Sequence, residues 1–379
     1  LSESTLKNLE AGRHRPGQST FTRLLAEPKL NLRPDDLLLE QPAAAGVSKG
    51  EFMNTFQSPL ADPLKAVVDL RERLQGEGGT LEQSALYLDH ASAEAWCQVA
   101  NQPAYAQRRE LRHLPDLAGV VSERTGPSGL DIIGLGCGDG HKEARLAQLL
   151  CAGCPPPTLR LFLLDVSQPL LGHAFKTAWH VAPGVSTFAI GGDFHRLPSY
   201  LGSLMERLGS RRRLLCFFGG TFGNLDNEVK FVRHNLQGLE PGDLLLLHVA
   251  RCFAPADQPM AVHRLDPQLN GATPADLRDL ERQWLTGPVE RYGRKVGEPL
   301  PILEVESRLE PAAAVVPGSY AIEKAVLVRD HDTAKPRRFV MTYVKRYDPD
   351  GLSACLGAIG WKPIAIYDQD DLLCLFERA

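Results

Sequence analysis

Glycine and acidic residues stand at the ends of several apolar runs in this sequence. Residues 134–140, GLGCGDG, separate an apolar run from a helical pattern at 142–150. Glycines allow a tight turn and a close approach of the backbone to a ligand, and the first N–H groups of the helix face that ligand. Asp165 ends the next apolar run, LFLLD, where its carboxylate can accept both hydroxyl protons of a ribose. This combination predicts a site for a nucleoside.

A third apolar run ends at Asp193, within GGDF. There the carboxylate can accept from the amino group of adenine, while Phe194 offers its ring and its backbone N–H. The glycine loop lacks the phosphate-binding pattern G-x-x-x-x-G-K-[ST], although its spacing allows a dinucleotide. The order of the carboxylates and the Pro-Gly-Asp turn at 241–243 favour a different adenosine-containing cofactor. Each carboxylate taken singly also fits an ordinary strand end or helix cap.

The fourth apolar run has an unusual ending. Residues 216–225, CFFGGTFGNL, pass from apolar residues through glycines to Asn224, at a point where a strand end would meet solvent or a ligand. We therefore expect Asn224 to contact a ligand.

These residues must be positioned by a sheet. From Leu130 onward, apolar strands alternate with helical segments, in the order LDIIGLG, LRLFLLDV, STFAIGGD, RRLLCFFGG and DLLLLHVA. This alternation predicts a doubly wound, Rossmann-like α/β fold with a parallel sheet wrapped by helices. Residues 251 to about 311 interrupt the rhythm with a helical stretch at 274–284, which we interpret as an insertion. A helix at 351–359 and a β-hairpin after it are expected to complete the sheet.

The domain organisation follows from these patterns. Residues 41–50, QPAAAGVSKG, have the composition of a flexible linker. We expect a helical segment at 1–40, a helical N-terminal part at 51–123 that contributes to the substrate site, a cofactor-binding core at 124–250, a smaller α+β substrate domain at 251–345, and a C-terminal helix and hairpin at 346–379.

The order of these motifs over about 130–379 resembles the class I S-adenosylmethionine-dependent methyltransferases. More narrowly, GGDF and FFGGTFGNL resemble the histidine-specific N-alpha-methyltransferases of ergothioneine biosynthesis. The resemblance implies S-adenosylmethionine as the cofactor and Asn224 as the residue that binds the amino and carboxylate end of the substrate. In a second matching segment, 86–114, it implies that Tyr105 reaches the substrate, so Asn224 and Tyr105 are the expected catalytic residues. The cofactor-binding residues that it implies are Gly136, Gly138, Lys142, Asp165, Val166, Asp193, Phe194 and Gly219.

The sequence departs from that family where the substrate ring is recognised. The family binds imidazole through a glutamate and a serine in E-x-S-x-K, and residues 341–345 are Met-Thr-Tyr-Val-Lys. A site that loses such hydrogen-bonding partners discriminates against the polar ring by about 10⁴-fold or more. The acidic residue before the glycine loop is also replaced, by Gly134. We therefore expect a substrate other than histidine, with Met341 and Tyr343 in its site; the alternative is that both pack as strand core.

The N-terminal segment resembles the second half of a lambda-repressor-like helix-turn-helix module, over residues 2–25. If this match holds, the sequence begins inside the recognition helix. Residues 1–33 hold six Lys or Arg against three Glu, an excess that suits contact with the phosphates of DNA. The alternative is a small helical module for dimerisation or capping.

Composition excludes several classes of protein. The formal charge is -4 with 43% apolar and 23% charged residues, so neither general disorder nor a chain-wide nucleic-acid-binding field is indicated. No apolar run approaches the ~20 residues of a membrane helix, and eight scattered cysteines fit reduced thiols, so we expect a cytoplasmic protein. Cys151 and Cys154 form a CxxC without further ligands at metal spacing, so no metal site is predicted.

Two functions from different classes remain. The first is an S-adenosylmethionine-dependent transferase that N-methylates an amino-acid-like or natural-product small molecule, with O-methylation as its enzymatic alternative. The second is a helix-turn-helix regulator whose methyltransferase domain binds cofactor or metabolite without turnover. The sequence does not determine the oligomeric state.

Overall fold

The computed structural model divides the chain into two compact units, residues 1–51 and 52–379. It describes only part of the second unit: residues 55–57, 70, 72–75, 78–87, 90–102, 111–125, 129–151, 159–198, 211–252, 275–296, 300–329, 335–368 and 371–379. The predicted helix-turn-helix segment at 1–40, the linker at 41–50, Tyr105 and Cys154 lie outside these residues.

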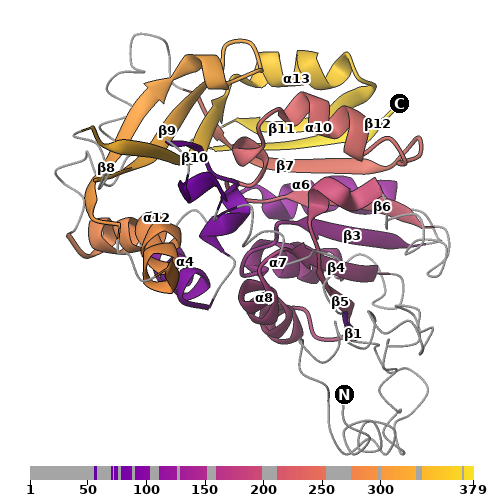
Figure 1. Ribbon diagram of the computed structural model, residues 1–379. Helices are drawn as coiled ribbons and strands as arrows, with labels where there is room; N and C mark the ends of the chain where they lie inside the picture. The colour runs from indigo at the N-terminus through magenta and orange to yellow at the C-terminus, as the bar shows by residue number, and fades with distance from the viewer. Residues whose placement is uncertain are drawn as a thin grey trace, which may run out of the picture. The chain divides into compact units, whose positions relative to one another are not determined.

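Five parallel strands form the centre of the sheet, in the spatial order β5-β4-β3-β6-β7. Their bounds are Leu130–Leu135 for β3, Leu159–Asp165 for β4, Ser186–Gly191 for β5, Arg212–Phe217 for β6 and Leu244–Arg251 for β7. The chain first adds strands on one side of β3 and then on the other (Figure 1). This reversal confirms the predicted doubly wound α/β sheet and places its ligand crevice at the carboxyl ends of the strands beside β3.

Alternate residues of these strands enter two different cores, which helices close on the two faces of the sheet. The helices are α6 (Leu114–Arg124), α7 (His141–Cys151), α8 (Gln168–Val181), α10 (Glu228–Asn235) and α13 (Pro349–Gly357). Ile133, Phe162 and Leu215 face the apolar cluster closed by α10 and α13. Ile132 and Leu246 face the opposite cluster, closed by α6, α7 and α8. Because both faces are covered, the strands are nearly continuous apolar runs.

The C-terminal hairpin pairs with the central sheet. Its strands are β11, Trp361–Asp368, and β12, Asp371–Arg378, and β12 pairs antiparallel with β7. One further short strand, β1, Thr55–Gln57, pairs with β5 at the other edge.

A second group of strands continues the sheet beyond β7. They are β8, Ile302–Glu310, β9, Tyr320–Val328, and β10, Arg337–Tyr347, and neighbours within the group are antiparallel. The junction is parallel pairing of Arg346 and Tyr347 in β10 with the end of β7. The short strand β2, Gly78–Thr80, pairs with the first half of β10. The domain boundaries expected from the sequence stay predictions.

Two expectations for the insertion were incomplete. The helix expected at 274–284 continues as α12, Ala275–Val296, through Pro288, and it packs against α4, His90–Asn101. Pro288 lacks a backbone N–H donor, but Leu285 and Val289 on either side of it are fully buried, and their packing stabilises the continued helix. Strand β8 was not expected, because its many polar residues obscure the apolar–polar alternation that is typical of a strand. Short 3-10 segments lie at Gln83–Leu86 (η2), Phe194–Arg196 (η4), Phe222–Asn224 (η5) and Pro311–Ala313 (η7).

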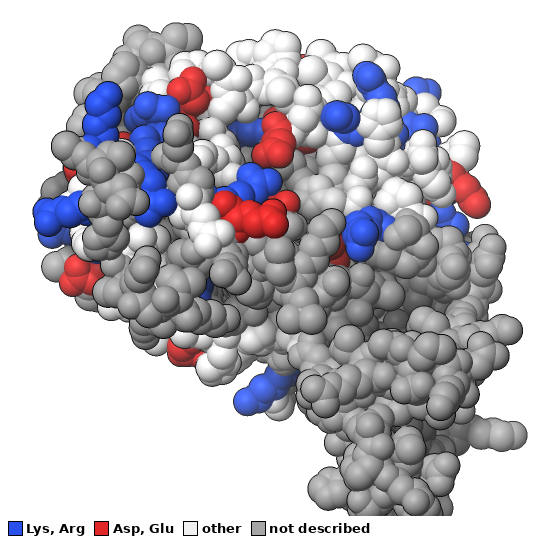
Figure 2. Space-filling view, viewed as in Figure 1, with Lys and Arg blue, Asp and Glu red and all other residues white. Residues whose placement is uncertain are grey.

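The described part of the chain shows neither a membrane span nor a metal cluster. None of its helices has the apolar length that a bilayer crossing requires. No group of His, Cys, Asp and Glu side chains among the described residues is arranged to hold a metal ion. On the face drawn in Figure 2, the described basic side chains are interspersed with acidic ones.

Truncating one central strand residue tests this core. Leu246 in β7 is fully buried, so we expect Leu246→Ala to lower the free energy of unfolding by about 2–5 kcal/mol through lost burial and a residual cavity. The control is Leu303→Ala on β8, where the side chain is 43% exposed and a change within about 0.5 kcal/mol is expected. Chemical denaturation measures both, and equal losses would contradict the assignment of the core.

Candidate functional site

The glycine loop is held by the end of the neighbouring strand. Gly136 donates its N–H to the Leu164 carbonyl at 2.8 Å. The Asp165 carboxylate accepts the N–H groups of Gly138 at 2.9 Å and Ser167 at 2.8 Å. Burial raises the pKa of Asp165 to about 6, although these hydrogen bonds oppose the shift. The buried carboxylate therefore ties the loop to the turn after β4, and Val166, next in the chain, is half-buried beside it.

The loop also touches the segment after β6. Gly136 has a φ of +62°, and a Cβ there would lie 2.6 Å from Thr221 Cγ2. Thr221 in turn donates its hydroxyl to the Gly136 carbonyl at 3.2 Å. Both the backbone conformation and the contact exclude a side chain at Gly136, so the two loops lie against each other at the crevice.

Asp193 and Phe194 lie together after β5, as predicted. Asp193 accepts hydrogen bonds from the backbone N–H and the ring of His195, both at 2.9 Å. Burial alone would raise the pKa of Asp193, but these bonds lower it below its ordinary value. The Phe194 ring makes edge contacts with Phe217 and Phe231, so its orientation is fixed by the core.

Asn224 ends the short turn η5, beyond the carboxyl end of β6. Its side chain is half-buried, and its amide nitrogen would lie 3.4 Å from a Cβ placed on Gly220. Among the described residues, none forms a hydrogen bond with this amide. The amide is thus beside the glycines at the mouth of β6 and retains its donors and acceptor for a ligand.

A buried ion pair holds the chain immediately after Asn224. Lys345 of β10 donates to the carbonyls of Leu225 and Asp226, the latter at 3.1 Å. It also pairs with Glu228 at 2.7 Å, with side chains 1% and 0% exposed. Lys345 is the lysine of the segment 341–345, so the strand that was expected to contact the substrate also positions the Asn224 turn.

Lys142 lies beside Gly219, because its Nζ would be 4.0 Å from a Cβ placed on that glycine. Its ammonium is 3.3 Å from Nδ1 of His248, which also accepts the Gly219 N–H at 3.2 Å. Because Nδ1 accepts, the ring proton lies on Nε2, which is 3.5 Å from the Asp371 carboxylate. This chain connects the glycine-loop helix, β7 and β12. The sequence analysis missed His248 and Asp371; a histidine within the apolar run LLLLHVA was the available signal.

An aromatic cluster lies against the glycine loop. Trp96 of α4 has its ring 5.0 Å from Trp284 of α12 and 5.9 Å from Tyr87. Its indole nitrogen would lie 3.9 Å from a Cβ placed on Gly138. Met341 is 1% exposed and belongs to the same apolar cluster. The thioether therefore lies in an apolar cluster whose Trp96 lies beside the glycine loop.

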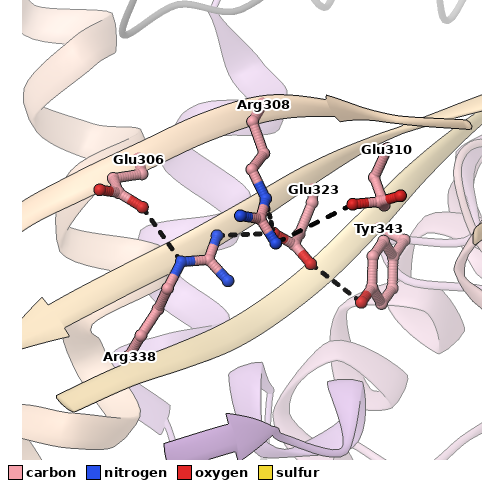
Figure 3. Close-up of polar contacts among 6 residues, drawn as sticks. All are labelled: Glu306, Arg308, Glu310, Glu323, Arg338 and Tyr343. Atoms are coloured by element: carbon pink, nitrogen blue, oxygen red, sulfur yellow. Dashed lines mark hydrogen bonds and ion pairs between the residues drawn. The ribbon is translucent and has the colours of Figure 1, made fainter.

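Tyr343 has a different surrounding, shown in Figure 3. Its hydroxyl donates to Glu323 of β9 at 3.0 Å. The other oxygen of this buried carboxylate accepts from Arg308 and Arg338, each at 2.6 Å. Burial would raise the pKa of Glu323, but hydrogen bonds from Arg338, Tyr343 and Arg308 hold it below its ordinary value. A carboxylate from the neighbouring strand thus lies beside the phenol.

The structure brings most of the predicted residues to the carboxyl edge of the sheet. Contacts connect the glycine loop with Asp165 and Thr221, and Lys142 with the Gly219 backbone through His248. Asp193 and Phe194 follow β5 at the same edge. The roles of these residues, and of Met341 and Tyr343 toward substrate, stay predictions, as does that of Tyr105.

The model of a family described as "Histidine-specific methyltransferase, SAM-dependent" matches residues 67–257, half of the chain. The match includes β3–β7 and the Asn224 turn. No curated protein matches. Similar solved structures include the CcbJ methyltransferase from Streptomyces caelestis, at 16% identity over 70% of this chain and 90% of that one, with a TM-score of 0.39. Another is the sugar N-methyltransferase KedS8 from Streptoalloteichus sp., at 14% identity over 70% and 86%, with a TM-score of 0.34.

The buried ion pair that positions Asn224 can be broken by one substitution. Lys345→Met leaves Glu228 buried without its cation, so we expect a loss of about 3–5 kcal/mol in the free energy of unfolding. Combining it with Glu228→Gln should recover part of that loss. Lys362→Met, at an exposed lysine, is the control. Chemical denaturation is the measurement, and a single variant as stable as the control would contradict the assigned pair.

Proposed function

Because the chain belongs to the family of histidine-specific, S-adenosylmethionine-dependent methyltransferases, we propose that it methylates a nitrogen of a small molecule other than histidine. Methyltransferase activity and the cofactor follow from the family. The acceptor atom and the acceptor class are inferred from the residues around Asn224.

The residues present fit the cofactor. A Cβ placed on Gly138 would meet only Trp96 at 3.9 Å, and one placed on Gly219 would meet only Lys142 at 4.0 Å, so a ligand can approach the backbone at both glycines. Asp165 at the end of β4 accepts a backbone N–H on each carboxylate oxygen and retains further lone pairs, so it can also accept from ribose hydroxyls. We assign Gly136, Gly138 and Asp165 to the nucleoside, with Asp193 and Phe194 at the base. We assign Lys142 and Gly219 to the methionine end, with Val166 beside the ribose.

One observation carries the proposal of nitrogen methylation. The Asn224 amide lies half-buried at the mouth of β6, unbonded to any described residue, on a turn held by the buried Lys345. An amide oxygen accepts from an amine N–H and so can orient the nitrogen lone pair. The family's own acceptor class, an amino acid, fits the same role. A hydroxyl acceptor would need its proton removed, and Asn224 provides no base for that step.

Alignment is the main contribution required of the chain. S-Adenosylmethionine supplies an electrophilic methyl group, and the bonding electrons remain on sulfur when the methyl is transferred. Holding a nucleophile in line with this group is worth about 7–11 kcal/mol in good cases. An α-amino group with a pKa near 8 is about one-tenth neutral at pH 7, so its deprotonation costs only about 1.4 kcal/mol. Asn224, with Tyr105 as the second proposed contact, therefore needs to orient the nitrogen and not to deprotonate it.

The surroundings of Met341 favour an acceptor with an aromatic or apolar end. Tyr87, Trp96 and Trp284 form a continuous aromatic cluster with Met341 nearby in the same core, and Trp96 reaches the glycine loop. This environment offers stacking in place of the polar partners that imidazole requires. Tyr343, with its hydroxyl held by Glu323, supplies the polar edge of the proposed site.

The regulatory alternative has no support among the described residues. Its helix-turn-helix match, over residues 2–25, falls outside them. DNA binding is therefore not part of the proposed function.

Removing the Asn224 amide tests the proposal directly. We expect Asn224→Ala to lower kcat/KM by about 100-fold, or about 2.7 kcal/mol, while S-adenosylmethionine affinity changes less than about threefold. Mass spectrometry of methyl transfer to tryptophan, tyrosine, phenylalanine, tyramine and histidine measures activity, and calorimetry measures affinity. Asp226→Ala, at the exposed neighbouring carboxylate, is the control. Activity unchanged in Asn224→Ala would contradict the assigned role, and histidine as the preferred acceptor would contradict the proposed substrate class.

The aromatic cluster has its own test. Trp96→Ala should raise KM for the preferred aromatic acceptor about 10-fold, because a stacking surface beside the loop is lost. Trp179→Ala, on a side chain that is 58% exposed on α8, is the matched control and should leave KM unchanged. An equal KM in both variants would remove the cluster from the acceptor site.

A further inference from the structure

An acidic side chain from α7 occupies the space beside Gly134, where the glycine loop begins. A Cβ placed on Gly134 would lie 2.7 Å from Cγ of Glu143 and 3.1 Å from its Oε1. Gly134 is the last but one residue of β3, and Glu143 is the third residue of α7. The absence of a side chain at Gly134 thus makes the space that the Glu143 carboxyl fills.

This carboxyl group is buried and incompletely bonded. Glu143 is 2% exposed, and its Oε1 has no hydrogen-bond partner among the described residues. A buried acceptor without a partner costs free energy, so its retention calls for an explanation. Other titratable groups lie around the loop: Asp139 and Cys137 within it, Lys142 on α7, Asp165 at the end of β4 and Cys216 on β6.

We propose that Glu143 is the acidic group that balances the positive charge of S-adenosylmethionine in this chain. It does so from the helix after the glycine loop, in the place left open by Gly134. The inference rests on the cofactor, and it holds whichever acceptor is methylated. Glu143 thus places a buried carboxyl beside the start of the loop that we assign to the cofactor, and Lys142 on the same helix contacts His248 at 3.3 Å.

The proposed role couples binding of S-adenosylmethionine to the protonation state of the Glu143 carboxyl. Burial raises the pKa of Glu143 to about 8, with the Asp139 and Asp165 carboxylates adding to the shift, so the carboxyl is mostly neutral at pH 7 without ligand. A cation that arrives nearby favours the ionised form, so binding releases the proton. S-Adenosylhomocysteine lacks the sulfonium charge and should release less.

A structural role alone makes different predictions. A glutamate at the third position of a helix can cap its N-terminus, and such a cap would support α7 without regard to the ligand's charge. Loss of a cap would weaken binding of the sulfonium and the thioether equally. Discrimination between the two ligands, together with proton release, therefore separates the two roles.

Calorimetry on the full chain at pH 7 provides the test. Titration with S-adenosylmethionine in two buffers of different ionisation enthalpy should show release of up to about 0.9 proton by the wild type, since a group with a pKa about 8 is about nine-tenths protonated there. Glu143→Gln should abolish this release and weaken S-adenosylmethionine binding about 10-fold, while S-adenosylhomocysteine affinity changes less than about threefold. Glu304→Gln, at an exposed glutamate on β8, is the control.

Two further measurements complete the experiment. One is protein stability as a function of pH, and the other is cofactor binding by a variant with the carboxyl group moved to strand β3. A raised folded-state pKa means that wild-type stability falls as pH rises from about 4.5 through about 8, so Glu143→Gln should be relatively more stable at pH 9 than at pH 5. Gly134→Asp combined with Glu143→Ala returns an acid to the strand and should bind S-adenosylmethionine more tightly than Glu143→Ala alone. Unchanged proton release and ligand discrimination in a folded Glu143→Gln variant would overturn the proposal.

Discussion

The buried carboxylate of Asp165 is the interaction on which the geometry of the site depends. It accepts backbone N–H groups from the glycine loop and from the turn after its own strand, and so converts two flexible connections into one rigid edge. The glycine loop then lies where Thr221 can bind its carbonyl, and the turn that carries Asn224 follows directly from Thr221. The buried Asp165 thereby connects, through Thr221, the loop that we assign to the nucleoside with the turn where we place the substrate amine.

The second constraint comes from strand β10. Its backbone extends the sheet from β7, and its Lys345 enters the protein interior to bind the chain after Asn224. A buried lysine is tolerated there because Glu228 supplies the counter-charge and two carbonyls accept its protons. The strand that carries Met341 and Tyr343 is therefore also the support of the residue that we assign to catalysis. Changes in substrate recognition along β10 can occur without losing that support.

Two carboxyl groups in this chain lie on elements next to those where the resemblance implies an acidic residue. Glycine occupies the strand position before the cofactor loop, and the carboxyl of Glu143 reaches the same place from α7. On β10, Met341 and Tyr343 stand where the resemblance implies a carboxylate and a hydroxyl, and Glu323 of β9 lies beside the phenol, neutralised by two arginines. By our proposal, Glu143 keeps an acidic group near the cofactor. The second group, Glu323, is buried in a network of ion pairs, and Met341 lies among aromatic rings, so the chemistry offered to an acceptor is different.

The sequence by itself determined the parallel core and the cofactor edge. Apolar runs that end in glycine or aspartate and alternate with helices are typical of buried strands whose carboxyl ends share one edge, so Asp165, Asp193 and Asn224 could be grouped before any coordinates. The polar strand β8 and the continuation of α12 through Pro288 could not be predicted, because burial against distant segments outweighs local pattern there. Tertiary structure alone brought Glu143 to Gly134, Lys345 to the Asn224 turn, and His248 between Lys142 and Asp371. These contacts form between side chains of elements that pack together in the fold. The spacing of residues along the sequence does not specify the distances between such side chains.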